Sequence, residues 1–187
     1  THGRKRRKVA IGIHDLNKVK PPLRYAALKP SDITFVPLQC TKEMTGKEIL
    51  QNVPKGGEYG YIIENAEKWP VVMDSLNRVM ALPPIINSEL TKLTPETTDL
   101  FIDVTGTDLN AVNKALNIMV TALADRGAKI EQVVNKGAFN SITPDLIPKV
   151  MKIDLDYCRK TLGIDIDIVD AASLLARMGH FVKPSDP

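Results

Sequence analysis

Apolar residues follow two spacings along the chain, and each spacing predicts one kind of element. Short alternating or continuous apolar runs, bounded by glycine, proline and polar residues, predict strands. Apolar residues that recur at helical spacing predict helices, the longest of which carries such residues from Leu109 to Leu123. The predicted strands span residues 9–13, 24–28, 33–38, 70–74, 79–82, 100–104 and 130–134. The predicted helices span residues 46–53, 59–68, 108–126, 154–162 and 167–178. These elements together predict an α+β fold class.

Local signals refine several of these elements. Thr45, with Glu48 three residues later, has the pattern of a capping box for the first helix. Thr107 or Asp108 is expected to cap the longest helix. Residues 24–28 follow two prolines, so this segment is at most an edge strand. The strand over residues 100–104 is apolar except for Asp103 and is predicted to be buried.

The chain is predicted to contain two domains, over residues 1–142 and 143–187. Its length of 187 residues exceeds the usual size of a single domain. Prolines at positions 144 and 148 form a linker-like stretch, and the two helices and possible strand that follow suggest a small separate unit. That unit offers only a small core, so it is expected to be weakly stable by itself.

A formal net charge of +3 does not identify a nucleic-acid-binding protein, but the distribution of charge is uneven. Five consecutive cationic residues stand near the beginning of the chain: Arg4, Lys5, Arg6, Arg7 and Lys8. Such a run is more often a solvated terminal arm than a binding site. Its functional interpretation is contact with RNA phosphates, which requires no sequence-specific geometry.

The known signatures of catalytic and metal sites are missing from the sequence. It has no GxSxG motif, no phosphate-binding glycine-rich loop and no HExxH motif. Cys40 and Cys158 stand far apart and outside any Cys/His cluster, so we expect neither a metal site nor a disulfide framework. Each of the three histidines is isolated and is interpreted as a surface or packing residue. No segment has the apolar length of a membrane span, and the composition fits a cytoplasmic protein.

Two segments carry polar residues where a pocket is plausible. In residues 82–89 a rigid Pro-Pro turn is followed by two isoleucines and then Asn87, Ser88 and Glu89. In residues 103–108 a strand ends in polar side chains beside a helix N-terminus, a favoured place for a pocket. The alternatives are structural: Asn87 is as readily a turn residue, and Thr107 and Asp108 are as readily a helix cap. The residues alone support an α/β domain with a polar pocket.

Three sequence strings occur in an order that resembles a known family. RKVAIGIHDL at residues 7–16, LPPIINSE at residues 82–89 and LFIDVTGTD at residues 100–108 resemble the β-subunit of archaeal and eukaryotic phenylalanyl-tRNA synthetases. The resemblance extends from about residue 2 to about residue 134 and corresponds to the region called the B3/B4 domain. From residue 143 onward the pattern resembles the start of the B5 domain. It implies a mixed-sheet B3/B4-like domain with flanking helices, followed by a partial helical B5-like unit.

The resemblance also implies an activity and partners. The family's enzyme is an (αβ)₂ heterotetramer whose α-subunit holds the aminoacylation site with ATP and Mg²⁺. No cofactor or metal is expected in this segment. The B3/B4 domain hydrolyses tyrosine wrongly esterified to tRNA-Phe, so the expected partners are the α-subunit, tRNA-Phe and Tyr-tRNA-Phe, and no membrane. The alternative is a non-catalytic scaffold and tRNA-docking module.

The resemblance assigns residues to the editing pocket. It implies catalytic roles for Asn87, Asp103 and Thr105. The expected substrate-binding residues are Ala81, Pro84, Ile86, Asn87, Glu89, Asp103 and Thr105. Relatives often carry serine at the position of Ala81, so one polar contact is expected to be absent here.

A pocket that requires a hydroxyl group is a physically sound editing device. An apolar pocket for phenylalanine rejects the added hydroxyl of tyrosine by only about a hundredfold. A second pocket can require that hydroxyl instead, because each buried polar group that phenylalanine leaves unpaired costs about 1–3 kcal/mol.

Overall fold

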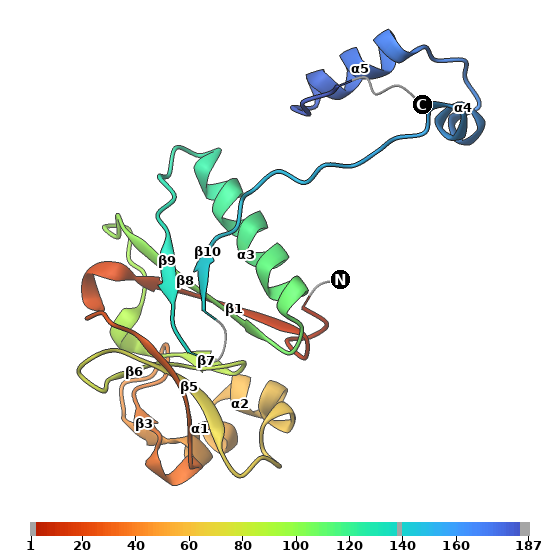
Figure 1. Cartoon of the computed structure of the whole chain (residues 1–187). Helices are drawn as coiled ribbons and strands as arrows, with labels where there is room; N and C mark the ends of the chain where they lie inside the picture. The colour runs from red at the N-terminus through yellow and green to blue at the C-terminus, as the bar shows by residue number, and fades with distance from the viewer. Residues whose placement is uncertain (1–2, 138–139, 184–187) are drawn as a thin grey trace. The chain divides into compact units, whose positions relative to one another are not determined.

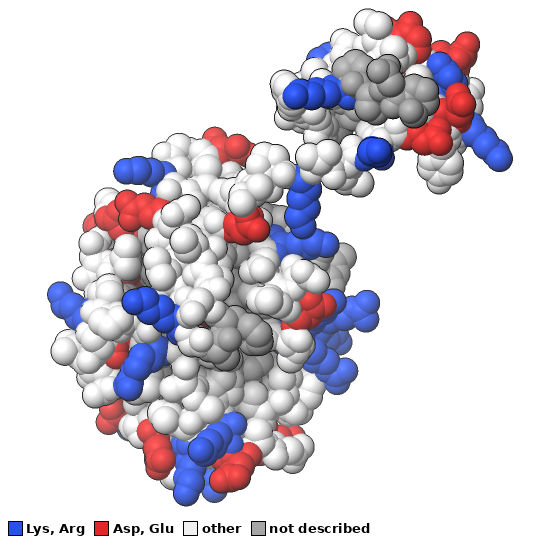
Figure 2. All heavy atoms as spheres, in the orientation of Figure 1, with Lys and Arg blue, Asp and Glu red and all other residues white. Residues whose placement is uncertain are grey.

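The computed structural model describes residues 3–137 and 140–183 and divides the chain into two compact units, Thr1–Leu146 and Ile147–Pro187 (Figure 1). The strands are β1 (Val9–Asp15), β2 (Arg24–Leu28), β3 (Thr34–Phe35), β4 (Met44–Thr45), β5 (Trp69–Met73), β6 (Val79–Leu82), β7 (Ile86–Asn87), β8 (Leu100–Gly106), β9 (Val133–Asn135) and β10 (Ser141–Thr143). The helices are α1 (Gly46–Asn52), α2 (Pro54–Tyr59), α3 (Leu109–Ala124), α4 (Leu155–Leu162) and α5 (Ile168–Arg177), with short 3₁₀ turns that include η3 (Gly60–Ile62) and η4 (Glu89–Thr91). Acidic and basic side chains are interspersed over the visible face of each unit (Figure 2).

The strands form antiparallel sheets, and the α+β class is confirmed. One sheet has the order β2-β5-β6-β7, and β1 pairs with β8, β3 with β4 and β9 with β10. The expected mixture of strand directions is wrong for the described strands, since every pair among them is antiparallel. Tight turns join β5 to β6 and β6 to β7, whereas parallel neighbours require long crossover connections. As predicted, β2 lies at a sheet edge.

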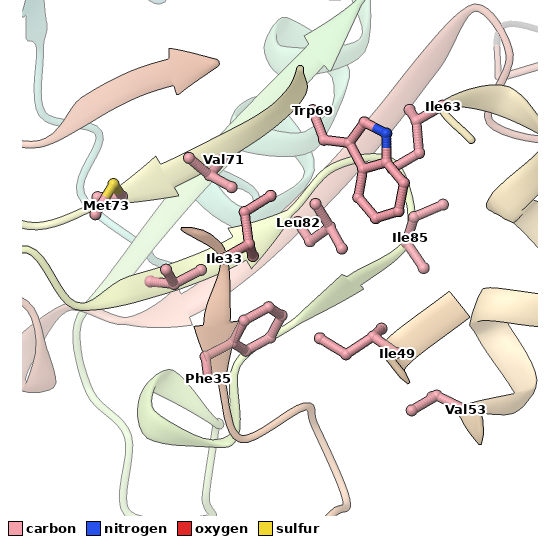
Figure 3. Packing of buried hydrophobic residues seen from close by; sticks show 11 residues of the cluster. Ile33, Phe35, Ile49, Val53, Ile63, Trp69, Val71, Met73, Leu82 and Ile85 are labelled. Carbon is pink, nitrogen blue, oxygen red and sulfur yellow. The ribbon is translucent and has the colours of Figure 1, made fainter. Parts of the chain in front are cut away.

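The main core lies between the four-stranded sheet and the first two helices. Figure 3 shows Trp69, Val71 and Leu82 from the sheet facing Ile33 and Phe35, with Ile49 of α1 beside them. Ile33, Ile49, Val71, Leu82 and Ile85 have no measurable exposure to solvent. Full burial of a side chain of this size contributes about 1.5–3 kcal/mol. This core therefore anchors the turn between β6 and β7, which contains Ile85.

Helix α1 follows its predicted signals, whereas the next helix does not. The Thr45 hydroxyl accepts from the Glu48 amide and the Glu48 carboxylate accepts from the Thr45 amide, which completes the capping box. The predicted helix over residues 59–68 is wrong: α2 begins at Pro54 and the chain leaves helical structure soon after η3. Proline suits the first position of a helix, so Pro54 starts α2 as α1 ends. Gly56 permits this arrangement, because a Cβ there would lie 2.1 Å from the Ile49 carbonyl oxygen.

Helix α3 packs on the β1–β8 pair through its smallest residues. Asp108 is its cap and accepts from the Ala111 amide, while Ala111 and Ala115 are buried against Val9. The larger apolar residues of its predicted face are partly buried, except for Leu109, which is 65% exposed. The prediction of a buried β8 is wrong, since its residues are half-buried or exposed in a sheet of only two strands. The strand predicted over residues 130–134 begins only at Val133.

The second unit contains the two predicted short helices. Asp154 and Asp167 cap α4 and α5, and Gly163 and Gly179 adopt left-handed conformations after them. The possible strand at Phe181 is not formed within the described residues, which end at position 183. The division after Leu146 lies slightly beyond the predicted boundary at residue 143, because β10 pairs with β9 in the first unit. The B3/B4-like and B5-like identities of the two units stay predictions, and the extreme residues of both lie outside the described ranges.

Candidate functional site

A pocket of about 290 Å³ lies where the β1–β8 pair meets the turn that joins β6 to β7. Five of the predicted substrate-binding residues line it: Pro84, Ile86, Asn87, Asp103 and Thr105. Asp103 and Thr105 are two positions apart on β8 and therefore face the same side. Across the strand pair they lie opposite Gly12 and Ala10, whose lack of bulk leaves space above the sheet. The three predicted catalytic residues, Asn87, Asp103 and Thr105, thus share one pocket.

Ala81 and Glu89 do not line this pocket. Ala81 pairs with Asn87 across β6 and β7, but it is 2% exposed and packs with Val72 and Met80 in the core. A methyl group buried there supports the wall and does not reach the cavity.

Glu89 acts on the pocket from outside. Its carboxylate accepts the Gln39 amide at 2.6 Å and pairs with the Lys92 ammonium at 2.8 Å. These two interactions hold the pKa of Glu89 below its ordinary value, the contact with Lys92 first. Gln39 lines the pocket and has a positive φ of 66°, so Glu89 fixes a wall residue in an uncommon conformation.

His14 is the functional residue that the sequence interpretation missed. Its side chain has no exposure to solvent, and its Nε2 lies 2.7 Å from Oδ1 of Asp103. Its Nδ1 lies 2.7 Å from the hydroxyl of Thr91 in η4. Both ring nitrogens of His14 therefore have hydrogen-bond partners, the Asp103 carboxylate at Nε2 and the Thr91 hydroxyl at Nδ1. A buried histidine therefore orients the carboxylate that faces the pocket.

Gly12 makes room for this contact. A Cβ at position 12 would lie 2.1 Å from Oδ1 of Asp103 and 3.0 Å from Nε2 of His14. His14 and Gly12 are two positions apart on β1, so the imidazole ring crosses the space that a side chain at position 12 would occupy. The sequence signal was a glycine and a histidine at alternating positions of one strand, a pattern that becomes informative only with the β1–β8 register.

The pocket continues toward a second hollow of about 270 Å³. Leu38, Gln39 and Asn87 line both hollows, and Thr91 lines the second. The hydrogen-bonded series Thr91–His14–Asp103 therefore connects the walls of the two hollows.

The five-residue basic run forms a turn, and part of it borders the pocket. The Lys8 amide donates to the Gly3 carbonyl, and Arg4, Lys5 and Arg6 have φ angles of 45°, 54° and 62°. Consecutive left-handed residues cost roughly 1–2 kcal/mol each. Arg6 lines the pocket and donates from Nη1 to the carbonyl oxygens of Pro84 at 2.9 Å and Ile85 at 2.7 Å. The solvated-arm interpretation therefore fails for Arg6.

The other members of the run have different surroundings. Arg7 lies over the ring of Tyr61, and Lys8 pairs with Asp108 at 2.8 Å. This ion pair, followed by the Ala111 amide, lowers the pKa of Asp108. Arg4 and Lys5 are exposed.

The described parts of the chain contain neither a cluster of metal ligands nor a membrane-spanning helix. No group of three or more histidine, cysteine, aspartate or glutamate residues there is placed to hold a metal ion. No helix in the same residues has both the length and the apolar character needed to cross a bilayer. Cys40 and Cys158 are both free.

Comparisons with known proteins agree on one family. No protein-family model matches the chain. The chain is 49% identical over 188 residues to the phenylalanine–tRNA ligase β subunit of Pyrococcus abyssi, covering all of this chain and 34% of that protein. It is 48% identical over 185 residues to the same subunit of Thermococcus kodakarensis, covering 98% of this chain and 32% of that protein.

A solved structure extends the agreement to the fold. The crystal structure of an N-terminal fragment of the phenylalanyl-tRNA synthetase β-subunit from Pyrococcus horikoshii superposes with a TM-score of 0.90 at 47% identity. It covers 95% of this chain, which in turn covers 52% of that fragment. The chain spans about a third of the length of the curated relatives named above. By this similarity over its whole length, the chain belongs to the family of archaeal phenylalanine–tRNA ligase β subunits.

Proposed function

We propose that the pocket hydrolyses tyrosine that has been wrongly esterified to tRNA-Phe, as the editing site of a phenylalanine–tRNA ligase. The observation that carries the proposal is the Asp103 carboxylate, which lines the pocket while buried His14 holds one of its oxygens. A volume of about 290 Å³ is near the lower limit for small-molecule pockets and suits an amino-acid-sized group.

The polar groups of the pocket match those of a tyrosyl ester. Asp103 accepts hydrogen bonds, and Asn87 and Thr105 both donate and accept. The substrate offers a phenol hydroxyl and an ammonium group as donors. Phenylalanine has no hydroxyl, so it would leave one of these polar groups unpaired at a cost of about 1–3 kcal/mol. That cost corresponds to roughly a 5- to 150-fold preference for tyrosine.

The proposed reaction is attack by water on the ester carbonyl carbon. The water oxygen forms a bond to this carbon, and the bond from the carbon to the ribose oxygen breaks. The ribose oxygen takes up one proton of the water, the other proton is released to solvent, and tyrosine leaves with a free carboxylate. The ester is already activated, so holding substrate and water in reactive geometry accounts for much of the acceleration.

The rest of the enzyme would supply synthesis. In the proposed (αβ)₂ assembly, the α-subunit carries ATP, Mg²⁺ and the aminoacylation site, and this segment corrects its errors. The five basic residues Arg4, Lys5, Arg6, Arg7 and Lys8 are proposed to contact tRNA-Phe.

A deacylation assay tests the proposal. The chain is incubated with Tyr-tRNA-Phe and with Phe-tRNA-Phe, and release of the amino acid is followed for the wild type and for Asp103→Asn. We expect faster release of tyrosine than of phenylalanine, and a loss of at least about tenfold in the variant. Thr98→Val, an exposed change on the approach to β8, is the control. Binding of tRNA without hydrolysis above the spontaneous rate would favour the scaffold and docking module instead.

A further inference from the structure

The surface beside the mouth of the pocket combines cationic and aromatic side chains. The guanidinium of Arg6 lies 4.2 Å from the ring centre of Tyr59, and the ammonium of Lys55 lies 5.4 Å from the same ring. The guanidinium of Arg7 lies 5.1 Å from the ring centre of Tyr61, whose hydroxyl accepts from Nε of Arg7 at 3.3 Å. These five residues, which we call the Arg-Tyr surface, come from the N-terminal turn and from the segment α2–η3.

The surface is positively charged overall. Lys55 pairs with Glu58 at 3.0 Å, and nearby Lys8 pairs with Asp108. Arg6 and Arg7, with the adjacent Arg4 and Lys5, take part in none of the ion pairs found among the described residues. Figure 2 shows basic side chains gathered at the edge of the first unit where Figure 1 places the N-terminal turn. An anionic partner is therefore favoured here.

The backbone of the N-terminal turn is strained, and its conformation determines where the side chains of Arg6 and Arg7 point. Arg4, Lys5 and Arg6 all have the left-handed backbone conformation, which non-glycine residues rarely adopt in succession. This conformation brings Arg6 onto the Pro84 and Ile85 carbonyls while Arg7 faces Tyr61. Strained residues of this kind are commonly kept at binding sites. The turn thus presents one guanidinium to the pocket and the next to an exposed ring.

We propose that the Arg-Tyr surface binds the unpaired 3′ end of an RNA and directs its last nucleotide into the pocket. Unpaired nucleotides are bound by cations that contact phosphates and by aromatic rings or guanidinium planes on which bases stack. Tyr61 is 41% exposed and offers such a ring, and Arg7 offers a guanidinium plane. Arg6 and Lys55 belong both to this surface and to the pocket lining, so a strand on the surface ends at the pocket. The inference rests on the proposed function only in that the last nucleotide carries the ester.

Binding of uncharged RNA tests the inference apart from catalysis. A fluorescein-labelled RNA hairpin with a short unpaired 3′ extension is titrated with the 187-residue chain, and fluorescence anisotropy gives Kd. The same hairpin with a blunt end is the comparison. Because neither RNA carries an amino acid, the measurement stands even if ester hydrolysis fails.

The variants separate stacking from charge. Tyr61→Ala removes the exposed ring, and Tyr61→Phe keeps it and serves as the matched control. Arg7→Gln removes one charge at the surface. Lys129→Gln removes one exposed charge beyond the far end of α3, whose 16 residues extend about 24 Å from Asp108. Arg6 is left unchanged, because it also holds the pocket turn.

The expected results differ between the variants. Tyr61→Ala should weaken binding of the extended hairpin by about fivefold or more, and Tyr61→Phe should not. Arg7→Gln should weaken it and reduce the slope of log K against log salt by about 0.7, whereas Lys129→Gln should leave it unchanged. The blunt hairpin should bind more weakly and be insensitive to Tyr61→Ala. Equal binding of both hairpins, or wild-type affinity of Tyr61→Ala, would overturn the inference and leave only general attraction of polyanions.

Discussion

The contact between His14 and Asp103 can be tested with two substitutions at position 14. Both supply a polar amide group, but only one places that group within reach of the Asp103 carboxylate. Asparagine at position 14 places its amide group where Nδ1 of the imidazole lies, and glutamine places its amide near Nε2. His14→Asn can therefore keep the bond to Thr91 but loses the bond to Asp103. His14→Gln can keep a donor for the Asp103 carboxylate. The two variants have similar polarity, so their difference reports on the 2.7 Å contact to Asp103.

The expected size of the effect follows from the kind of bond. A hydrogen bond to a charged group contributes about 1.5–3 kcal/mol, and each 1.36 kcal/mol of barrier is tenfold in rate. If that bond fixes the carboxylate for the substrate, His14→Asn should lower kcat/KM for Tyr-tRNA-Phe by roughly 10- to 150-fold. His14→Gln should recover most of this loss.

The assay is deacylation of Tyr-tRNA-Phe under single-turnover conditions, with thermal unfolding measured on the same samples. His14 is fully buried, so both variants are expected to lose some stability. Thr91→Val keeps the shape of Thr91 and removes its hydroxyl, and it should fall between the wild type and His14→Asn. Equal rates for the asparagine and glutamine variants, or rates that follow only the melting temperature, would refute the positioning role of His14.

Three further predictions concern other parts of the molecule. Gly12→Ala should lower deacylation by at least about tenfold with little change in tRNA binding, because its Cβ would displace the Asp103 carboxylate; full activity would contradict the packing at this position. Burial would raise the pKa of Asp74, but hydrogen bonds and charge from Arg78 lower it below its ordinary value. The contribution of Asp74 to the free energy of unfolding is therefore present above its unfolded pKa of about 3.9 and is lost as the pH falls through the lower folded value. Asp74→Asn should make the free energy of unfolding, measured by circular dichroism, depend less on pH between about pH 5 and 2. Amides of α5 should exchange at least about tenfold faster than those of residues 112–123 in α3, and equal protection would indicate one cooperative domain.

Local signals in the sequence were sufficient for many elements. The capping box at Thr45, the strands β5 and β6, and the capped helices α4 and α5 depend on residues a few positions apart. Pro54 was ambiguous because the same residue that cannot continue one helix can begin the next. A helix can begin at Pro54 because Gly56 lets the chain pass close to Ile49, and the spacing of apolar residues in the sequence does not show this contact.

The pocket was predictable only in part, and for a similar reason. Asn87, Asp103 and Thr105 do line one cavity, but it was the family resemblance that brought these distant segments together. Ala81 and Glu89 were assigned to the pocket by the same resemblance, but Ala81 packs in the core and Glu89 is not among the lining residues. His14 was missed because its partners are 77 and 89 positions away, and only the β1–β8 register and η4 bring them into contact.

The close packing over Gly12 also constrains how this site can evolve. Gly12, His14 and Asp103 share one small volume, so the effect of a substitution at one position depends on the residues at the other two. A larger residue at position 12 is tolerated only after the imidazole or the carboxylate has become smaller or moved. If the side chain of His14 or of Asp103 is shortened first, the pocket loses its oriented carboxylate. The three positions are therefore epistatic, and single-step routes away from this arrangement pass through variants with a damaged pocket.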